Sequence, residues 1–169
     1  MNTKLNQPTL GVIYGNRDFF PDALVTEARV DIAKLFAEYG IKAIQLDESD
    51  SKLGGVETHN DARKCAELFK KHADEIDGIL VCLPNFGDEK GVADTLKLAG
   101  LNVPVLIQGY PDDPKQLMPS RRRDSFCGKI SVCNNLVQAG IKFSLTSKHV
   151  SHPTSDSFKR DLQKFLGVC

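Results

Sequence analysis

Short apolar runs alternate with amphipathic helical patterns along the chain, and this alternation constrains the fold more than any other feature. The run Gly78–Leu83 is apolar throughout, as expected of a central parallel strand that is covered on both faces. Four further runs have the same strand-like character: Thr9–Tyr14, Lys42–Leu46, Val103–Gln108 and Lys142–Thr146. Because helical patterns separate these runs, we expect a parallel sheet.

A helical stripe follows each predicted strand. In the first stripe, apolar residues recur at spacings of three and four from Leu24 to Tyr39, and Gly40 ends the pattern. Thr58 and Asp61 resemble a capping box at the start of the second helix. The apolar positions of the later stripes are Ala62, Cys65, Phe69, Ala73 and Ile76, then Val92, Leu96 and Ala99, then Ile130, Cys133 and Val137, and finally Phe158, Leu162, Phe165 and Leu166. Five successive strand–helix units predict a three-layer, flavodoxin-like (Rossmann-like) α/β domain, with a five-stranded parallel sheet in the order 2-1-3-4-5.

Length and charge limit the function classes. The chain has 169 residues, which is about the length of one average domain, so we expect a single domain over residues 1–169. Its 22 Lys and Arg residues balance 22 Asp and Glu residues, so there is no net positive field to attract nucleic acid or anionic lipid. No apolar run approaches the roughly 20 residues of a membrane span. We therefore expect neither a nucleic-acid partner nor a membrane partner.

Cysteine usage and the first residues bear on the compartment. The chain has five cysteines, an odd number, and none of them forms a CxxC motif. The segment Met1–Pro8 is polar and has no apolar run of the length that a signal peptide needs. Both features favour a reduced, cytoplasmic setting over a disulfide framework.

The predicted strand order places a ligand crevice between the loops that follow the first and third strands. These loops are Gly15–Pro21 and Pro84–Glu89, and they bring together a cation, an aromatic ring, amides and acids. Arginine and amides donate hydrogen bonds to hydroxyl groups, and an aromatic face packs on the C–H side of a sugar, so the mixture suits a polyol. The alternative is that these are solvated turn residues selected for backbone geometry, and residue types alone favour it.

Other ligand classes fit these loops less well. The loop after the first strand is bulky and acidic, unlike the Ser/Thr/Gly loop that holds a flavin phosphate, and it lacks a dinucleotide fingerprint. Arg123 stands where a P-loop preceding Gly128-Lys129 needs its first glycine. The pair His149 and His152 has no third metal ligand nearby in the sequence, and no GxSxG nucleophile motif is present.

The segment Ser120–Lys129 is the most unusual stretch of the sequence. The three arginines Arg121–Arg123 precede a predicted helix N-terminus, which Asp124 or Ser125 caps, and Cys127 lies in its first turn. The functional interpretations are anion binding or a reactive thiol. The structural interpretations are pairing with Asp112 and Asp113, or docking of another domain. Docking or sugar contact is favoured over thiol catalysis because no base is evident near Cys127, and the individual roles of Arg121, Arg122, Arg123 and Cys127 are left open.

Three segments together resemble the N-terminal domain of the L-fucose/L-arabinose isomerase-like family: Gly15–Pro21, Leu83–Glu89 and Arg122–Leu136. The resemblance extends in the same order from about Thr9 to Phe165, and its last segment is the most distinctive. The family interconverts aldoses and ketoses through an enediol, using a divalent cation that is usually manganese. The resemblance implies a flavodoxin-like lid that packs against a neighbouring subunit and contacts that subunit's pentose or 6-deoxyhexose substrate.

The resemblance also implies which positions meet the substrate. They are Arg17, Asn85, Phe86, Gly87, Glu89, Arg123, Asp124 and Lys129. The metal ligands and the acid/base residues of the family come from domains that follow this one, so we expect no catalytic residue, metal ligand or cofactor in this chain. The first hypothesis is thus a lid and oligomerisation domain of an isomerase that is not catalytically competent alone. The alternative is a free-standing sugar-binding or regulatory module without enzymatic activity.

Overall fold

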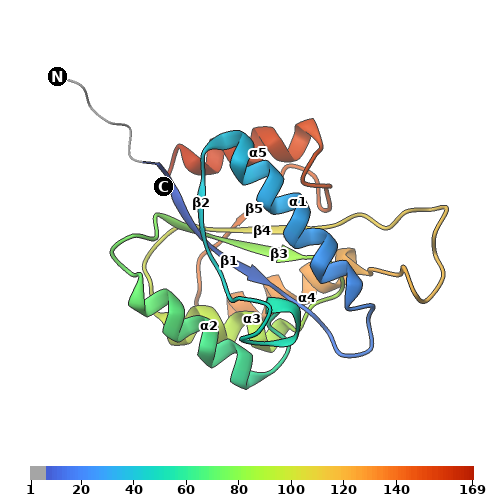
Figure 1. Ribbon diagram of the computed structural model, residues 1–169, viewed down its shortest axis with the longest axis horizontal. Helices are drawn as coiled ribbons and strands as arrows, with labels where there is room; N and C mark the ends of the chain where they lie inside the picture. The colour runs from blue at the N-terminus through green and yellow to red at the C-terminus, as the bar shows by residue number, and fades with distance from the viewer. Residues whose placement is uncertain (1–6) are drawn as a thin grey trace.

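A computed structural model describes residues 7–169 and shows a sheet of parallel strands in the order β2-β1-β3-β4-β5. The predicted topology and strand order are therefore confirmed (Figure 1). The strands are β1 (Thr9–Tyr14), β2 (Lys42–Ile44), β3 (Gly78–Leu83), β4 (Val105–Gly109) and β5 (Ser144–Leu145).

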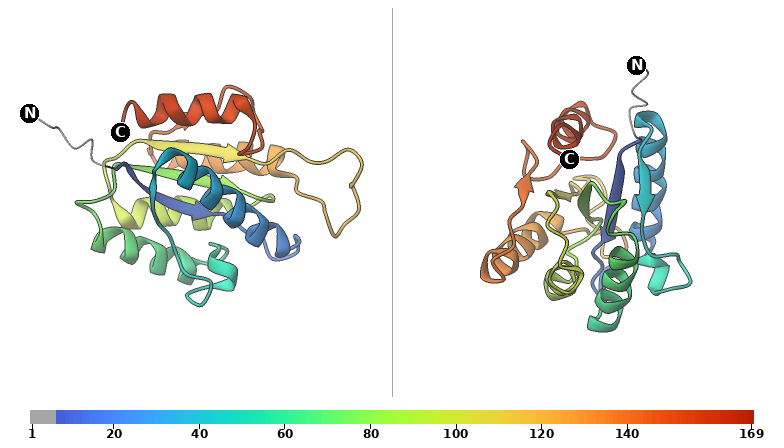
Figure 2. Two further views of the ribbon diagram at one scale, coloured as in Figure 1. Left: turned by 45° about the horizontal axis from the view of Figure 1, so that its top comes forward. Right: turned by 90° about the vertical axis from the view of Figure 1, so that its left-hand side faces the viewer.

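Helices cover both faces of the sheet, which gives the three predicted layers (Figure 2). Helices α1 and α5 pack on one face, and α2, α3 and α4 pack on the other. The helices are α1 (Ala23–Tyr39), α2 (His59–Lys71), α3 (Glu89–Ala99), α4 (Ser125–Gln138) and α5 (Asp156–Leu166), and a short 3-10 turn covers Lys52–Gly54. Among the described residues, no helix combines the length and the apolar character that crossing a membrane requires.

The two central strands form the middle of the core. Every residue of β1 and of β3 is buried, as predicted for a strand that helices cover on both sides. Successive side chains alternate between the two faces: Ile79 and Val81 join the α2–α4 side, whereas Leu80 and Cys82 join the α1–α5 side. The carboxyl ends of β1 and β3 consequently sit on a rigid base, and the loops that leave them are held in place.

Local details match the sequence patterns at most helix ends. Gly40 and Gly100 end α1 and α3 in the left-handed conformation, and Thr58 and Asp61 form the predicted capping box of α2. The edge strands β2 and β5 are shorter than predicted, because an edge strand has only one neighbour to extend its ladder. Helix α2 also ends before the predicted position of Ile76, which nevertheless remains in the core.

Helix α4 departs from the predicted orientation. The stripe of Ile130, Cys133 and Val137 identified the helix correctly, but Ile130 and Val137 are exposed. The residues that face the interior are Ser125, Gly128, Lys129, Val132 and Leu136. The buried face of α4 contains a glycine, a serine and a lysine. A prediction from hydrophobic periodicity counts only apolar side chains, so it assigned the wrong face of this helix to the core.

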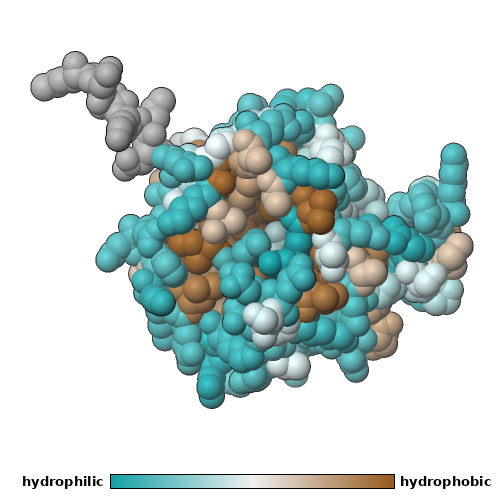
Figure 3. All heavy atoms as spheres, in the orientation of Figure 1, coloured by the Kyte–Doolittle hydropathy of each residue, from teal (hydrophilic) through white to brown (hydrophobic). Residues whose placement is uncertain are grey.

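The long segment between β4 and α4 projects beyond the sheet (Figure 1). At its base, Arg121 forms two hydrogen bonds with the carboxylate of Glu27 on α1, at 2.5 and 3.1 Å. On the face that carries β2, hydrophobic residues show among hydrophilic ones between α1 and α2 (Figure 3). Most of the polar segment Met1–Pro8 lies outside the described residues.

Candidate functional site

The loops that follow β1 and β3 meet at the carboxyl edge of the sheet. Arg17 donates a hydrogen bond to the carboxylate of Glu89, and its guanidinium lies 5.1 Å from the centre of the Phe86 ring. The ring of Phe20 stacks near Phe86 with centroids 6.0 Å apart. The prediction that Arg17 and Phe86 converge on one edge of the sheet is therefore confirmed.

Two buried amides hold these loops together. Asn85 donates from Nδ2 to the side-chain oxygen of Asn16 at 2.7 Å, and its own side-chain oxygen accepts the backbone N–H of Gly87 at 3.0 Å. Gly87 has a φ of 74°, a conformation that favours glycine. Asn85 and Gly87 thus shape the turn that presents Phe86, and the Asn85 side chain stays buried beneath it.

Helix α3 starts directly behind this turn. The Asp88 carboxylate accepts the backbone N–H of Gly91 at 2.6 Å and caps the helix, which places Glu89 in the first turn. The positive end of the helix dipole favours the Glu89 carboxylate there, and Arg17 neutralises it from the other side. In the part of the chain that the structure describes, this carboxylate is the only hydrogen-bond partner of the Arg17 side chain, so four of the five guanidinium N–H groups are available to a ligand.

An acidic group from the loop after β2 joins the edge. Asn16 donates to Asp22 at 3.0 Å and to Glu57 at 2.8 Å, and burial raises the pKa of the Glu57 carboxyl above its ordinary value. Lys52 pairs with Asp22 at 2.9 Å, and this contact raises the pKa of its ammonium group. The sequence interpretation missed Lys52 and Glu57. The sequence signal that could have found them is the pair Gly54-Gly55. These glycines allow the segment after β2 to approach the end of β1, where Val56 forms a parallel β-bridge with Gly15.

Arg123 stabilises the start of the turn that presents Phe86. Its guanidinium donates to the carbonyl oxygen of Pro84 at 2.8 Å, pairs with Glu27 at 3.2 Å and lies 4.7 Å from the centre of the Tyr110 ring. The side chain is largely buried, so these contacts serve the fold. Arg123 touches the residue that begins the Phe86 turn but does not join the Arg17 group.

Asp124 occupies the position before α4 but makes no side-chain cap. Its backbone is left-handed, with a φ of 49°, and its carboxylate pairs with Arg122 at 2.6 Å. The expected capping of α4 by Asp124 or Ser125 is therefore wrong: Ser125 is already the first helical residue, and its hydroxyl has no hydrogen-bond partner among residues 7–169.

The arginine cluster separates into different contacts. The ion-pair partner of Arg121 and Arg123 is Glu27 rather than Asp112 or Asp113. Asp112 instead accepts the backbone N–H of Arg123 at 2.8 Å. Cys127 is exposed, and within the described chain no side chain forms a hydrogen bond with its thiol.

Lys129 lies in the interior. Its side chain is fully buried, and its ammonium group donates to Thr146 Oγ1 at 2.7 Å and to the carbonyl oxygen of His149 at 2.8 Å. Burial lowers the pKa of this ammonium group to about 8. The structure therefore places Lys129 between α4 and the segment that follows β5, away from the surface on which Arg17 lies.

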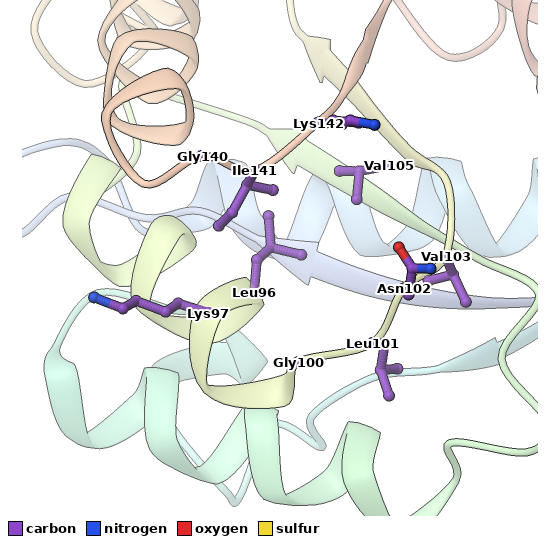
Figure 4. Close-up of a pocket in the computed structure, with 10 residues that line it drawn as sticks. All are labelled: Leu96, Lys97, Gly100, Leu101, Asn102, Val103, Val105, Gly140, Ile141 and Lys142. Atoms are coloured by element: carbon purple, nitrogen blue, oxygen red, sulfur yellow. The ribbon is translucent and has the colours of Figure 1, made fainter.

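Hollows lie at both ends of the strands. A cavity of about 170 Å³ at the carboxyl edge is lined by Phe19, Phe20, Pro119, Arg122 and Asp124. A larger pocket of about 370 Å³ lies at the opposite edge, between the ends of α3 and α4 (Figure 4). Its lining combines apolar side chains such as Leu96, Val103 and Ile141 with Lys97, Asn102 and Lys142, and it includes none of Arg17, Phe86 and Glu89.

Metal binding is a separate question, because the sequence resemblance implies a divalent cation in the full-length enzymes. Over residues 7–169, no three His, Cys, Asp or Glu side chains come close enough together to hold one. The side chains present at the carboxyl edge thus do not fit a metal centre, and we derive no chemical step through a metal from them.

Comparison with known families identifies one match. The model of the fucose/sulfoquinovose isomerase N-terminal domain matches residues 11–169, which is nearly the whole chain. The matched range includes all three segments on which the resemblance rested, together with the Arg17–Phe86–Glu89 group. No curated protein sequence matches the chain.

Proposed function

Because the chain belongs to the fucose/sulfoquinovose isomerase N-terminal domain family, we propose that it is the lid and subunit-contact domain of an aldose–ketose isomerase of the fucose/arabinose type. The observation that carries this proposal is the convergence of Arg17, Phe86 and Glu89 at the carboxyl edge of the sheet. In this fold, that edge is where ligands bind.

The three side chains offer complementary contacts to a pentose or a 6-deoxyhexose. The face of Phe86 packs on the C–H side of the sugar, the free N–H groups of Arg17 donate to hydroxyl oxygens, and the Glu89 carboxylate accepts a hydrogen bond from a hydroxyl group. The half-exposed position of Phe86 leaves part of its ring available. Together they can bind and orient a sugar held mainly by a neighbouring subunit.

The other proposed site residues act through this group. Asn85 and Gly87 fix the turn that carries Phe86, and Arg123 holds Pro84 at its start. Asp124 and Lys129 fix the beginning of α4, against which the turn packs. We assign these five residues to positioning and reserve direct sugar contact for Arg17, Phe86 and Glu89.

We assign the isomerisation chemistry to other domains of the enzyme. An enediol step needs a base at the substrate carbon and an electrophile at its carbonyl oxygen, and a divalent cation such as manganese supplies the second. The Arg17 group provides hydrogen bonds and an ion pair but no unpaired base beside a cation site. We propose that the chain acts in the cytoplasm, alongside the remaining domains or neighbouring subunits.

Sugar titration followed by NMR tests the sugar contact. Adding L-fucose or L-arabinose to the isotope-labelled chain should shift resonances of Arg17, Phe86 and Glu89 at millimolar sugar. Arg17→Ala should remove these shifts, whereas Arg63→Ala, on the exposed surface of α2, should leave them unchanged. Sugar that produces no shift at this edge would contradict the proposed contact. Metal-dependent aldose–ketose turnover by the purified chain would contradict the assignment of catalysis to other domains.

A further inference from the structure

The outer flank of α4 carries an exposed apolar stripe. Phe126, Ile130 and Val137 have exposed fractions of 51%, 52% and 67%, and the half-buried Cys133 lies between them. Spacings of four, three and four residues put these side chains along one side of the helix. Ordinary surface helices place such a stripe toward the core, so its exposure calls for a partner.

Strand β5 extends this stripe. Leu145 is 53% exposed and pairs in register with Ile107, whose side chain belongs to the core on the α4 side of the sheet. Residues in register on neighbouring strands point to the same face, so Leu145 lies on the α4 side. The ring of His149, which follows β5, lies 4.3 Å from that of Phe126. We call Phe126, Ile130, Cys133, Val137 and Leu145 the α4–β5 face.

This face occupies an outer edge of the molecule. Strand β5 is the edge strand of the sheet, and Figure 2 shows α4 as the helix farthest along the same side. The buried Lys129, adjacent to Ile130, reaches toward Thr146 and His149, so the stripe lies on the flank of α4 that turns toward the β5 edge. In the part of the chain that the structure describes, Phe126, Ile130, Val137 and Leu145 stay exposed at this edge, although the His149 ring lies beside Phe126 and Cys133 packs partly against the core.

The face also lacks charge. Lys129 is the only charged residue among the 14 of α4, and it is buried. Helix α5, by comparison, carries Asp156, Lys159, Arg160, Asp161 and Lys164 in 11 residues. Charged residues make up 26% of the whole chain, so the accessible surface of α4 differs clearly from the rest. Depletion of charge is characteristic of the buried centre of protein–protein interfaces.

We propose that the α4–β5 face binds the same face of a second copy of this chain about a two-fold axis. A two-fold axis brings a surface against itself, so any charge near the axis meets the same charge. A face without accessible charge avoids that repulsion, whereas the charged outer surfaces of α2 and α5 do not. Because β5 has only two residues, the contact forms by packing of α4 side chains rather than by pairing of strand edges.

The proposal deepens the subunit-contact part of the proposed function, on which it rests, but it does not use the sugar group. Arg17 and Phe86 belong to the loops after β1 and β3, Glu89 begins α3, and none of them is part of the α4–β5 face. Sugar contact and self-association can thus be tested separately on the same protein.

Sedimentation equilibrium of the 169-residue chain over a range of micromolar concentrations tests the proposal. We expect a concentration-dependent species of twice the monomer mass. Ile130→Glu and, independently, Val137→Glu should weaken self-association by about 10- to 100-fold, because each dimer then brings two like charges into an apolar contact. Val30→Glu is the matched control: it adds the same charge to a 47%-exposed valine of α1 and should leave the association unchanged.

Each outcome decides the question. A chain that stays monomeric at the highest concentration, or dimers that persist in both α4 variants, would overturn the proposal; in the first case another domain is the partner of this face. Circular dichroism and thermal melting verify that the variants fold, as expected for substitutions at exposed positions. Sugar-induced NMR shifts that persist in a monomeric Ile130→Glu variant would show that the sugar contact stands on its own. Absence of those shifts in a protein that still dimerises would remove the sugar contact alone.

Discussion

The two halves of the carboxyl edge use similar residues in different ways. Around β1 and β3, Arg17 lies at the surface over Phe86 and has unused donors. Around β4 and β5, Lys129 is fully buried and both of its partners belong to the protein itself. A basic side chain near the end of a parallel strand is therefore not by itself a ligand site. It can bind a ligand only where the neighbouring segments leave it exposed.

The covering chain accounts for the difference. The loops after β1 and β3 are short, and the buried Asn85 side chain donates to that of Asn16 between them, while Arg17 and Phe86 stay partly exposed. The segment after β4 is long and folds back, fastened to α1 through Arg121 and Glu27. The two halves touch at Gly128, where α4 packs directly on the backbone of Phe86. A side chain at this position would overlap that backbone.

The largest expected effect is on stability and comes from the buried half. Lys129→Ala should lower the free energy of unfolding by about 3 kcal/mol, since it leaves a cavity and removes the hydrogen bonds to Thr146 and to the His149 carbonyl. Urea unfolding followed by circular dichroism measures the change. Lys142→Ala, at an exposed position, is the control and should stay within about 0.5 kcal/mol of the wild type. Equal losses of stability in the two variants would contradict the structural role that we assign to the buried Lys129.

The sequence was sufficient for the fold because most of its patterns are local. The apolar run Gly78–Leu83 and the glycines that end α1 and α3 fix the strand order and the helix boundaries without knowledge of distant contacts. The orientation of α4 could not be obtained this way, because its buried face contains Lys129, whose partners lie at positions 146 and 149. Hydrophobic patterns do not report a polar side chain that the fold satisfies internally.

The candidate site was predictable from the sequence only in part. Strand order alone brought Arg17 near Phe86, because the loops after β1 and β3 are neighbours in this topology. The contribution of Glu57 and Lys52 was not predictable, since it depends on how the irregular segment after β2 folds back along Gly15. Nor did the residue types distinguish the partly exposed Arg17 from Arg123, which is largely buried and binds Pro84 and Glu27.

Gly128→Ala tests the connection between the halves. The added methyl group would overlap the carbonyl oxygen of Phe86, so the turn must move, at an expected cost of about 2 kcal/mol. Denaturant unfolding gives the loss of stability, and NMR shifts of Phe86 and Arg17 report the displacement. Ser131→Ala, on the same helix, should change neither measurement. Unchanged Phe86 resonances in Gly128→Ala would mean that the halves are independent.

The pH dependence of stability sharpens the description of Lys129. Burial lowers its pKa to about 8 in the folded protein, whereas an unfolded chain has an ordinary lysine pKa of about 10.4. Between these values the unfolded state binds more protons than the folded state, so the contribution of Lys129 to stability rises with pH, by at most about 1.4 kcal/mol per pH unit. Below pH 8 both states are charged and the desolvation cost is fully present. Unfolding of the wild type and of Lys129→Met at pH 7.5 and 9.5 measures this contribution as the difference between their slopes; parallel profiles would contradict it.

The smallest expected effect is in the exposed half, where the Arg17–Glu89 pair should contribute little to stability. Both side chains are partly exposed, so water and salt screen their attraction, and pairs of this kind contribute about 0.5 kcal/mol. A double-mutant cycle with Arg17→Ala, Glu89→Gln and the combined variant isolates the coupling energy, which should decrease further in high salt. A coupling of several kcal/mol that is insensitive to salt would show that Arg17 is as much a part of the fold as Lys129. A small coupling, together with loss of sugar-induced shifts in Arg17→Ala, would show that this pair is retained for a ligand rather than for the fold.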